Sequence, residues 1–237
     1  MKKTRILIFF LFLNTVLFGQ GLKLSCDIGY GFYELSDLKY LQHSALYFFI
    51  PVPIESVETF PNNIFYSGSM EYLINRRNLV GINGAYYSTG GRNHIQDYSG
   101  EIRWDMPLSG YKVGIQYKNL LVTFNKFSIY GEFSSGVIFS KLKINLYNNV
   151  PQIDINSFSS YYKGKNLFLE PALGFIYEFS DKWSVDLCFG YEWNYGGKLH
   201  YKNEKDSELT TVGGNPIQVN WKGYRSVLGI SYNILWN

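Results

Sequence analysis

The chain has 237 residues, of which 19% are aromatic and 17% charged, with 22 Lys and Arg against 19 Asp and Glu. Lys2, Lys3 and Arg5 account for the difference, so the chain after its first 19 residues is formally neutral and offers no electrostatic argument for nucleic-acid binding. Two cysteines do not make a disulfide scaffold.

The N-terminal segment, residues 1–19, has the three parts of a secretory signal. Basic residues come first, an apolar run follows over residues 6–18, and Gly19 supplies a small residue at the expected cleavage point. The apolar run is too short to span a bilayer as a helix. We therefore expect a signal peptide over 1–19 and one β-domain over 20–237.

Alternation of apolar and polar positions predicts strands along the rest of the chain. In residues 224–237, Leu228, Ile230 and Tyr232 lie on an apolar face, while Gly229 and Ser231 lie on a small or polar face. The same pattern predicts seven earlier strands, at about 22–33, 63–75, 79–88, within 97–118, 127–142, 167–179 and 183–195.

The connections between these strands alternate in length. Tight turns are expected at 76–78 and 180–182 and somewhere within 119–126, and long loops at 34–62, 89–96, 145–165 and 196–218. In the fourth strand, Ile102, Trp104 and Met106 have the opposite parity to the apolar residues after Pro107, which predicts a bulge or edge defect at the proline. The pattern as a whole predicts an all-β, eight-stranded antiparallel up-and-down barrel.

Such a barrel could be soluble, with its apolar face inside, or inserted in a membrane, with that face outside. The polar face is rich in glycine, including Gly29, Gly136 and Gly174, which suits a crowded lumen better than a wet surface. Tyr and Trp recur at both ends of the apolar face, as in the aromatic girdles of membrane barrels. Both features favour a transmembrane β-barrel.

The pattern resembles the small eight-stranded outer-membrane proteins of Gram-negative bacteria, of the OmpA transmembrane-domain and OmpX type. The resemblance implies short periplasmic turns, long extracellular loops, and contact with outer-membrane lipids including lipopolysaccharide. It also implies insertion by the outer-membrane assembly machinery, with the terminal strand (Tyr232, Ile234, Trp236) as the signal. It does not determine an activity.

The charged residues on the inward face of the predicted barrel are the clearest candidate for a functional site. They are Asp27, Glu71, Glu132, Glu170, Asp186, Glu192, Lys112 and Arg225. Counting from the turns predicts one layer with Asp27, Glu71, Lys112 and Glu132, and a second with Glu170, Glu192 and Arg225. An ion or proton path is one interpretation. A network of ion pairs that fills the lumen is favoured, because eight strands leave room for little beyond side chains.

Other residue types that could support chemistry are scattered. His43, His94 and His200 are all predicted in outer loops, and we recognise no hydrolase pattern around them. Cys26 and Cys188 are predicted on opposite faces of non-adjacent strands, so we expect no disulfide. The spacing of possible ligands predicts no metal site and no cofactor.

The first long loop contains an apolar stretch, residues 45–54, that begins at Ala45 and ends at Ile54. It either extends the first hairpin and folds over the barrel mouth, or binds a protein partner. We therefore expect a non-enzymatic barrel with a structural, adhesive or partner-binding role. The alternatives are a lipid A or phospholipid hydrolase or acyltransferase at the rim, and a narrow ion pore.

Overall fold

The computed structural model describes residues 21–48, 55–98, 100–150, 156–202, 204–211 and 213–234. The expected signal peptide and Trp236 lie outside this part of the chain. So does most of the apolar stretch 45–54, of which only the backbone of residues 45–48 is described. Within the described residues, none of the helices is both long enough and apolar enough to cross a bilayer.

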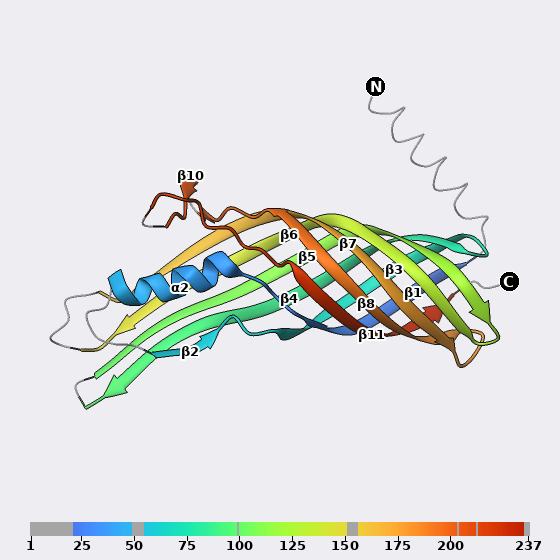
Figure 1. Ribbon diagram of the computed structural model, residues 1–237, viewed down its shortest axis with the longest axis horizontal. Helices are drawn as coiled ribbons and strands as arrows, with labels where there is room; N and C mark the ends of the chain where they lie inside the picture. The colour runs from blue at the N-terminus through green and yellow to red at the C-terminus, as the bar shows by residue number, and fades with distance from the viewer. Residues whose placement is uncertain are drawn as a thin grey trace, which may run out of the picture.

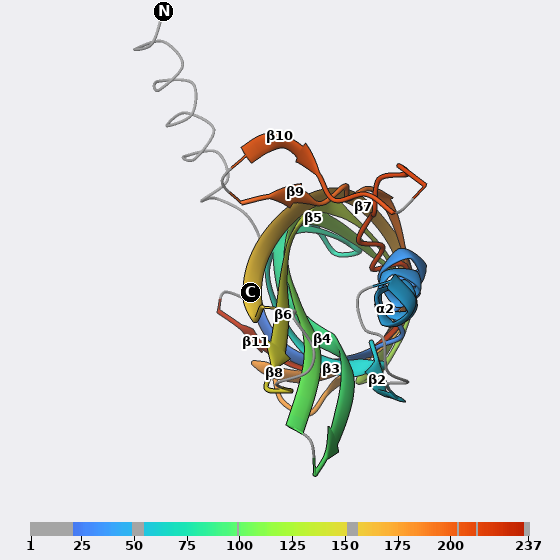
Figure 2. The same cartoon turned by 90° about the vertical axis from the view of Figure 1, so that its left-hand side faces the viewer.

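Long antiparallel strands form a closed ring (Figures 1 and 2). The ring consists of β1 (Leu22–Gly31), β3 (Asn63–Asn75), β4 (Asn78–Asp97), β5 (Gly100–Phe124), β6 (Phe127–Asn148), β7 (Phe158–Glu178), β8 (Trp183–Gly196) and β11 (Gly223–Asn233). The first and last of them close it, with Cys26 opposite Ile230. The eight-stranded barrel that the sequence predicts is confirmed.

The two ends of the ring differ in their connections. At one end, here called the turn end, tight turns at 76–77, 125–126 and 179–182 join neighbouring strands. Asn125 adopts a left-handed conformation with φ 52°, which its short polar side chain tolerates. The opposite end, the loop end, carries α2 (Ser36–Phe48), β2 (Glu55–Thr59), β9 (His200–Tyr201) and β10 (Glu204–Glu208).

Four strands of the ring are much longer than predicted. β4, β5, β6 and β7 have 20, 25, 22 and 21 residues, whereas β1, β3, β8 and β11 have 10 to 14. Their extra residues project beyond the loop end as a sheet, here called the wall (Figure 1). The loops predicted at 89–96 and 145–165 are therefore largely wrong, because paired strands occupy most of these residues.

Of the bulge or edge defect predicted at Pro107, the bulge is wrong, although the pairing of β5 with β6 is interrupted at Met106 and Pro107. The pairing of β4 with β5 continues without a shift through Gly90 opposite Pro107. Ile102, Trp104 and Met106 do have the opposite parity to Tyr111, but they point inward and are at most 4% exposed. They are apolar because the wall has a hydrophobic core on its inner face.

That core is built from segments on the same side of the wall. α2 contributes Leu38, and the chain between β10 and β11 contributes Ile217, Val219 and Trp221, all 0% exposed. Ser36 and Asp37 suit the start of α2, since short polar side chains accept bonds from the first free amides. Figure 2 shows α2 beside the mouth of the ring. The irregular connection predicted at 34–62 thus contains a helix of 13 residues and the short strand β2.

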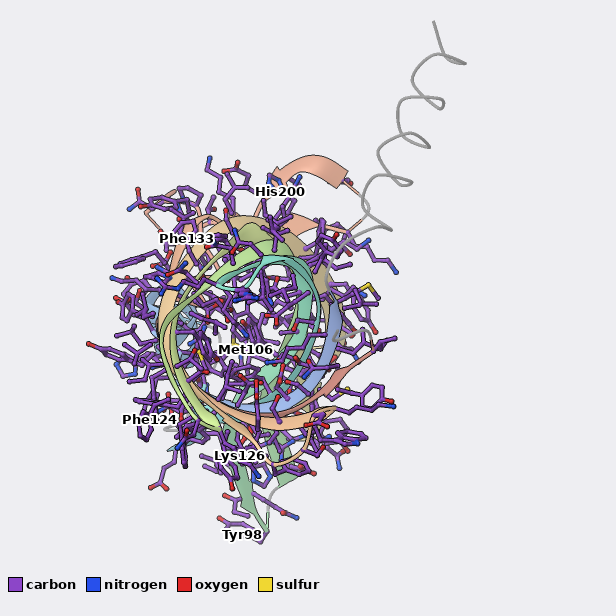
Figure 3. The ribbon with its side chains drawn as sticks, turned by 90° about the vertical axis from the view of Figure 1, so that its right-hand side faces the viewer. Tyr98, Met106, Phe124, Lys126, Phe133 and His200 are labelled. Carbon is purple, nitrogen blue, oxygen red and sulfur yellow. The ribbon has the colours of Figure 1, made fainter. Side chains whose placement is uncertain are left out.

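The ring itself has an apolar outside and a polar inside. Outward side chains are large and exposed, and they include Ile28, Tyr66, Ile82, Val113, Ile115, Phe133, Leu173, Phe189, Leu228 and Ile230. Figure 3 shows Phe133 outside the ring and Met106 within it. Glycine faces inward where large side chains cross the lumen: a Cβ on Gly29 would lie 2.2 Å from the Phe65 ring. The ring thus exposes apolar side chains and buries polar ones, which is the reverse of the arrangement in a soluble protein.

Candidate functional site: the charged lumen

Glu192 is the centre of a cluster of charges in the loop-end half of the lumen. It lies on the inward face of β8 and is 0% exposed. One carboxylate oxygen accepts hydrogen bonds from Lys112 Nζ at 3.0 Å and from Tyr87 Oη at 2.9 Å. The other accepts from Arg225 Nη2 at 3.2 Å and Asn194 Nδ2 at 3.1 Å. Lys112 also pairs with Glu170, so two cations meet two carboxylates.

Arg225 connects this cluster to the chain that covers the lumen. Its Nη1 donates to the carbonyl of Phe32 at 2.9 Å and that of Tyr224 at 3.0 Å, and Nη2 also donates to the carbonyl of Trp221. The guanidinium carbon lies 5.0 Å from the centre of the Tyr33 ring and 5.2 Å from that of Tyr87. The structure therefore places Arg225 between Glu192 and Phe32, the residue that follows β1.

A second cluster occupies the turn-end half of the lumen. Lys118 Nζ lies 2.8 Å from Glu71 Oε1 and 3.5 Å from Glu132 Oε2. Lys23 Nζ lies 2.9 Å from Asp186 Oδ2, which also accepts from Ser231 at 2.6 Å. Burying charges is costly unless each finds a partner, and these side chains meet that requirement for one another.

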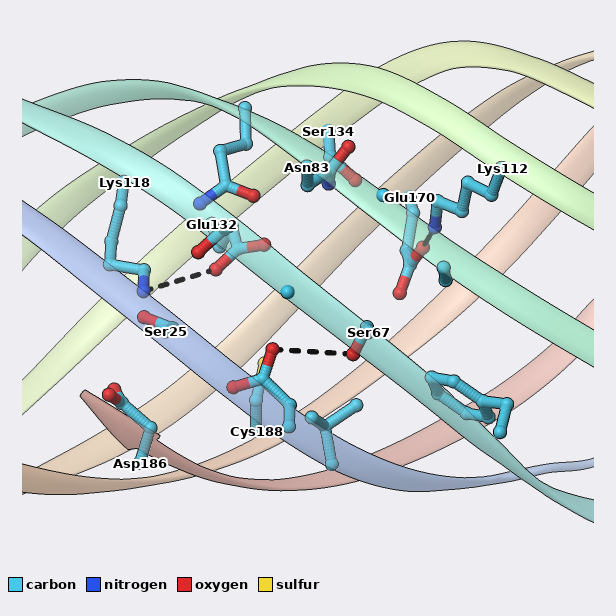
Figure 4. Close-up of a pocket in the computed structure, with 18 of the residues that line it drawn as sticks. Ser25, Ser67, Asn83, Lys112, Lys118, Glu132, Ser134, Glu170, Asp186 and Cys188 are labelled. Carbon is cyan, nitrogen blue, oxygen red and sulfur yellow. Dashed lines mark hydrogen bonds and ion pairs between the residues drawn. The ribbon is translucent and has the colours of Figure 1, made fainter.

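Between the two clusters lies a cavity of about 80 Å³, shown in Figure 4. Its lining includes Asp27, Glu132, Glu170 and Cys188. Asp27 accepts a hydrogen bond from Ser67 at 3.3 Å. A volume of this size holds a few water molecules and no larger ligand. Toward the loop end from this cavity lie the buried rings of Tyr87 and Trp221, with their centres 5.4 Å apart.

The predicted layers are partly wrong. Lys112 belongs with Glu192 and Glu170 near the loop end, and not with Glu71 and Glu132. The error comes from the turn after β5: this strand continues to Phe124, so Lys112 lies farther from the turn end than expected. Glu71 and Glu132 do share a cluster.

Sequence reasoning missed two cations of the network, Lys118 and Lys23. Lys118 continues the inward parity of Lys112, Gly114 and Gln116 at the end of the predicted strand within 97–118, so the alternation alone identifies it as an inward cation. Lys23 has the same parity as Asp27 in the first predicted strand, which places it on the inward face. With both included, four cations oppose six carboxylates.

The remaining candidates do not assemble into a site. His43 lies in α2, His94 in β4 and His200 in β9, so all three lie at the loop end, but in regular elements and not in the predicted outer loops. His94 Nε2 lies 3.2 Å from Glu101 Oε1. Cys26 is exposed, and Cys188 lies on a strand not paired with β1; both are free thiols. Among the described residues, no group of His, Cys, Asp and Glu could hold a metal ion.

Part of the terminal strand's expected assembly signal can be placed. Tyr232 pairs with Leu24 of β1, and its ring centre lies 4.8 Å from that of Trp183. The Ile234 amide donates to the Leu22 carbonyl at 2.8 Å, and its side chain is 43% exposed. The role of these residues in assembly stays a prediction.

Solved structures with this architecture identify the fold. A major outer membrane protein from Thermus thermophilus matches with a TM-score of 0.51 and 10% identity, over 90% of this chain and 99% of that one. The chain has the fold of an outer-membrane β-barrel. The protease OmpT of Escherichia coli (TM-score 0.41, 12% identity, 90% and 97% covered) is also similar. Ail of Yersinia pestis, in complex with the heparin analogue sucrose octasulfate, is also similar. Its TM-score is 0.37 and its identity 12%, over 91% of this chain and 100% of that one.

No family model and no curated protein sequence matches the chain. The barrel fold, together with an apolar exterior and a charged interior, makes the protein an integral protein of the outer membrane. The exposed apolar side chains of the ring are its lipid-facing surface. The turn end then faces the periplasm and the loop end the exterior, as in other barrels of this kind.

Proposed function

We propose that the protein is a non-enzymatic, non-conducting barrel that holds a stiff binding surface outside the membrane. The observation that supports this proposal most is the wall. Outer loops of a small barrel need not have regular structure, yet here β4 to β7 remain paired far beyond the ring. A paired sheet with its own hydrophobic core keeps a surface in a fixed shape, which reduces the entropy lost on binding.

The wall is held from its inner side by specific contacts. Gln42 of α2 donates to Asn93 Oδ1 of β4 at 2.8 Å and to the Glu58 carbonyl of β2 at 2.6 Å. Asp37 accepts from the Gln218 amide at 3.0 Å, which ties the start of α2 to the chain before β11. Truncating the side chains of Gln42 and Asp37 should loosen the wall without altering the lipid-facing ring.

The outer face and tip of the wall are left for a partner. Tyr98, at the tip of the β4–β5 hairpin, is fully exposed, and Val57 on the edge strand β2 is 60% exposed. Beside them lie ion pairs, with Arg92 Nε 2.6 Å from Asp105 Oδ1. This interaction with Asp105 raises the pKa of Arg92. The apolar stretch 45–54 remains a second candidate for partner contact.

Surface display tests this proposal. Cells of a non-adherent host that express the protein should gain adhesion to immobilised extracellular proteins or glycans. Cells that express a variant with residues 95–102 replaced by Asn-Gly should lose that gain, because the shortened hairpin keeps His94 opposite Arg103. Both proteins must show the gel shift on boiling that marks a folded barrel. Equal adhesion of both would contradict a role for the wall.

The rival function is a lipid hydrolase, and the observation that favours it is the pair of His94 and Glu101, which lies near the tip of the wall and not at the rim of the ring. A carboxylate can orient a histidine that acts as a general base. Incubating the folded protein with phospholipid and lipid A, followed by mass spectrometry of the products, separates the two functions. Acyl release that is abolished by His94→Gln would replace the binding role with catalysis.

A further inference from the structure

The outward face of β6 and β7 changes from apolar to basic within one step along each strand. On β6, Phe139 is followed by Lys141 and Lys143 on the same face; on β7, Leu167 is followed toward the loop end by Lys165 and Lys163. Lys202, next to β9, joins them. We call these five lysines, Lys141, Lys143, Lys163, Lys165 and Lys202, the lysine patch.

The lysine patch is compact. Lys141 and Lys163 are direct cross-strand partners, as are Phe139 and Lys165. Lys143 and Lys202 both lie over the ring of Tyr161, at 5.3 and 5.6 Å from its centre. Four of the five, all but Lys165, line one groove of about 620 Å³. Hydrogen bonds with Ser159 and Lys143 lower the pKa of Tyr161 at the edge of the groove.

The positive charge of this patch is not balanced by the protein. Like charges directly opposite each other in an antiparallel pair are destabilising. None of the five ammonium groups forms an ion pair with a carboxylate in the described part of the chain, and no acidic residue described there lines the groove. Inside the ring, by contrast, Lys23, Lys112 and Lys118 are all paired. An external anion would offset the repulsion at the patch.

The position of the lysine patch indicates which kind of anion binds there. Just toward the turn end lie outward aromatic residues, among them Tyr86 and Tyr111 with ring centres 5.1 Å apart. Lys141 Nζ lies 4.8 Å from the centre of the Tyr111 ring and Lys165 Nζ 5.9 Å from that of Phe139. Aromatic belts of barrels lie at the membrane interface, and lysines beside them place their ammonium groups among lipid head groups.

We propose that the lysine patch binds the phosphorylated head group of a lipid in the outer leaflet. The ammonium groups of Lys141, Lys143 and Lys163 face its phosphates, and an acyl chain lies along Phe139 and Leu167, which are 47% and 59% exposed. The continuity of the basic groove with the lipid-facing surface favours a lipid over a soluble anion. The site is independent of the wall's proposed binding role.

Native mass spectrometry of the full-length protein tests the proposal. The folded protein is incubated with equal amounts of lipid A and its dephosphorylated form in detergent. We expect retention of the phosphorylated lipid, and a loss of about ten- to thirtyfold in affinity for Lys141→Gln with Lys163→Gln, at about a kilocalorie per mole for each lysine. The matched control, Lys126→Gln with Lys182→Gln, removes the same charge at the turn end and should bind as well as the unaltered protein.

Three results would overturn the proposal. One is equal retention of the dephosphorylated lipid. Another is an equal loss of binding in the turn-end control, which would indicate a general charge effect. The third is competition by a phosphorylated disaccharide without acyl chains at the same concentration as the lipid, which would assign the groove to a soluble anion. If the first double variant fails to fold, Lys143→Gln with Lys202→Gln gives the same comparison, because both residues line the groove.

Discussion

Arg225 Nη2 lies 3.2 Å from Glu192 Oε1, and neither side chain is exposed to solvent. The pair joins β11 to β8 across the inside of the ring and holds the chain that covers the lumen through the carbonyls of Phe32 and Trp221. A buried charge that loses its partner is costly. Mutations at this ion pair therefore test how strongly the chain that covers the lumen is held in place.

Replacing Arg225 with Met should lower the stability of the folded barrel in denaturant by about 3 kcal/mol, at the low end for breaking a buried pair. The loss is moderated because Glu192 keeps Lys112 and Tyr87 as partners. Adding Glu192→Gln should recover part of it, with a coupling energy of about 1–3 kcal/mol in the double-mutant cycle. Simple additivity of the two changes would show that the pair contributes nothing.

A second prediction concerns the lipid-facing surface. Ile230 is 46% exposed on the outward face of β11, three residues before the strand ends at Asn233, and it pairs with Cys26 and Val185. Ile230→Arg should destabilise the inserted barrel relative to the unaltered protein, because it places a charge on the lipid-facing surface, where the cost reaches about 2–4 kcal/mol at the membrane midplane. Ile230→Ala is the matched control and should insert nearly normally. Equal insertion of both variants in liposomes would show that Ile230 does not face lipid.

Two glycines of β6 should respond differently to alanine. A Cβ on Gly136 would lie 2.2 Å from the Val113 carbonyl oxygen and 2.5 Å from the Gly114 Cα, both backbone atoms that cannot easily move. Gly136→Ala should therefore cost about 1–3 kcal/mol of unfolding free energy. At Gly131 the nearest atom is 3.9 Å away, so Gly131→Ala should be close to neutral. Equal effects on the urea midpoint would contradict the close approach of β5 and β6 at Gly136.

Trp221 is the largest fully buried side chain above the charged lumen. It packs edge-on against Tyr33, at 5.1 Å between ring centres, and its Nε1 donates to Ser140 Oγ at 2.9 Å. Trp221→Ala should cost about 3–5 kcal/mol because it opens a cavity. Trp221→Phe keeps most of the packing and removes the hydrogen bond, so it should cost less. Thermal unfolding followed by near-ultraviolet circular dichroism measures both losses of stability. A larger loss for Trp221→Phe than for Trp221→Ala would contradict this prediction.

The ring could be predicted from the sequence because its residues carry a strict two-residue period. The sequence predicts a strand over residues 63–75 with Glu71 inward and Tyr72 outward, and β3 has these bounds and faces. One face meets lipid and the other a crowded lumen, so a slip by one residue would exchange the two environments. The same constraint makes the inward position of Arg225 predictable.

The wall and α2 could not be predicted in the same way. At Trp104 and Met106 the inward face is apolar because it meets α2 and the chain before β11, and that contact depends on the fold. In α2 the buried stripe includes the polar Gln42, which is 1% exposed and bonded to Asn93, so the helical period is weak. The local sequence does not show which distant segments pack against the wall or against α2, so these contacts could not be predicted.

Our central proposal is that the ion pairs and Trp221 seal the lumen, so that the protein acts from its outer surface. Single-channel recording in planar bilayers tests it most directly, with insertion of folded protein verified by the gel shift on boiling. We predict no current steps above the baseline of the empty bilayer. Reproducible ion-selective steps from the unaltered protein, changed in size by Lys112→Met, would contradict the proposal and make the charged lumen a conducting path.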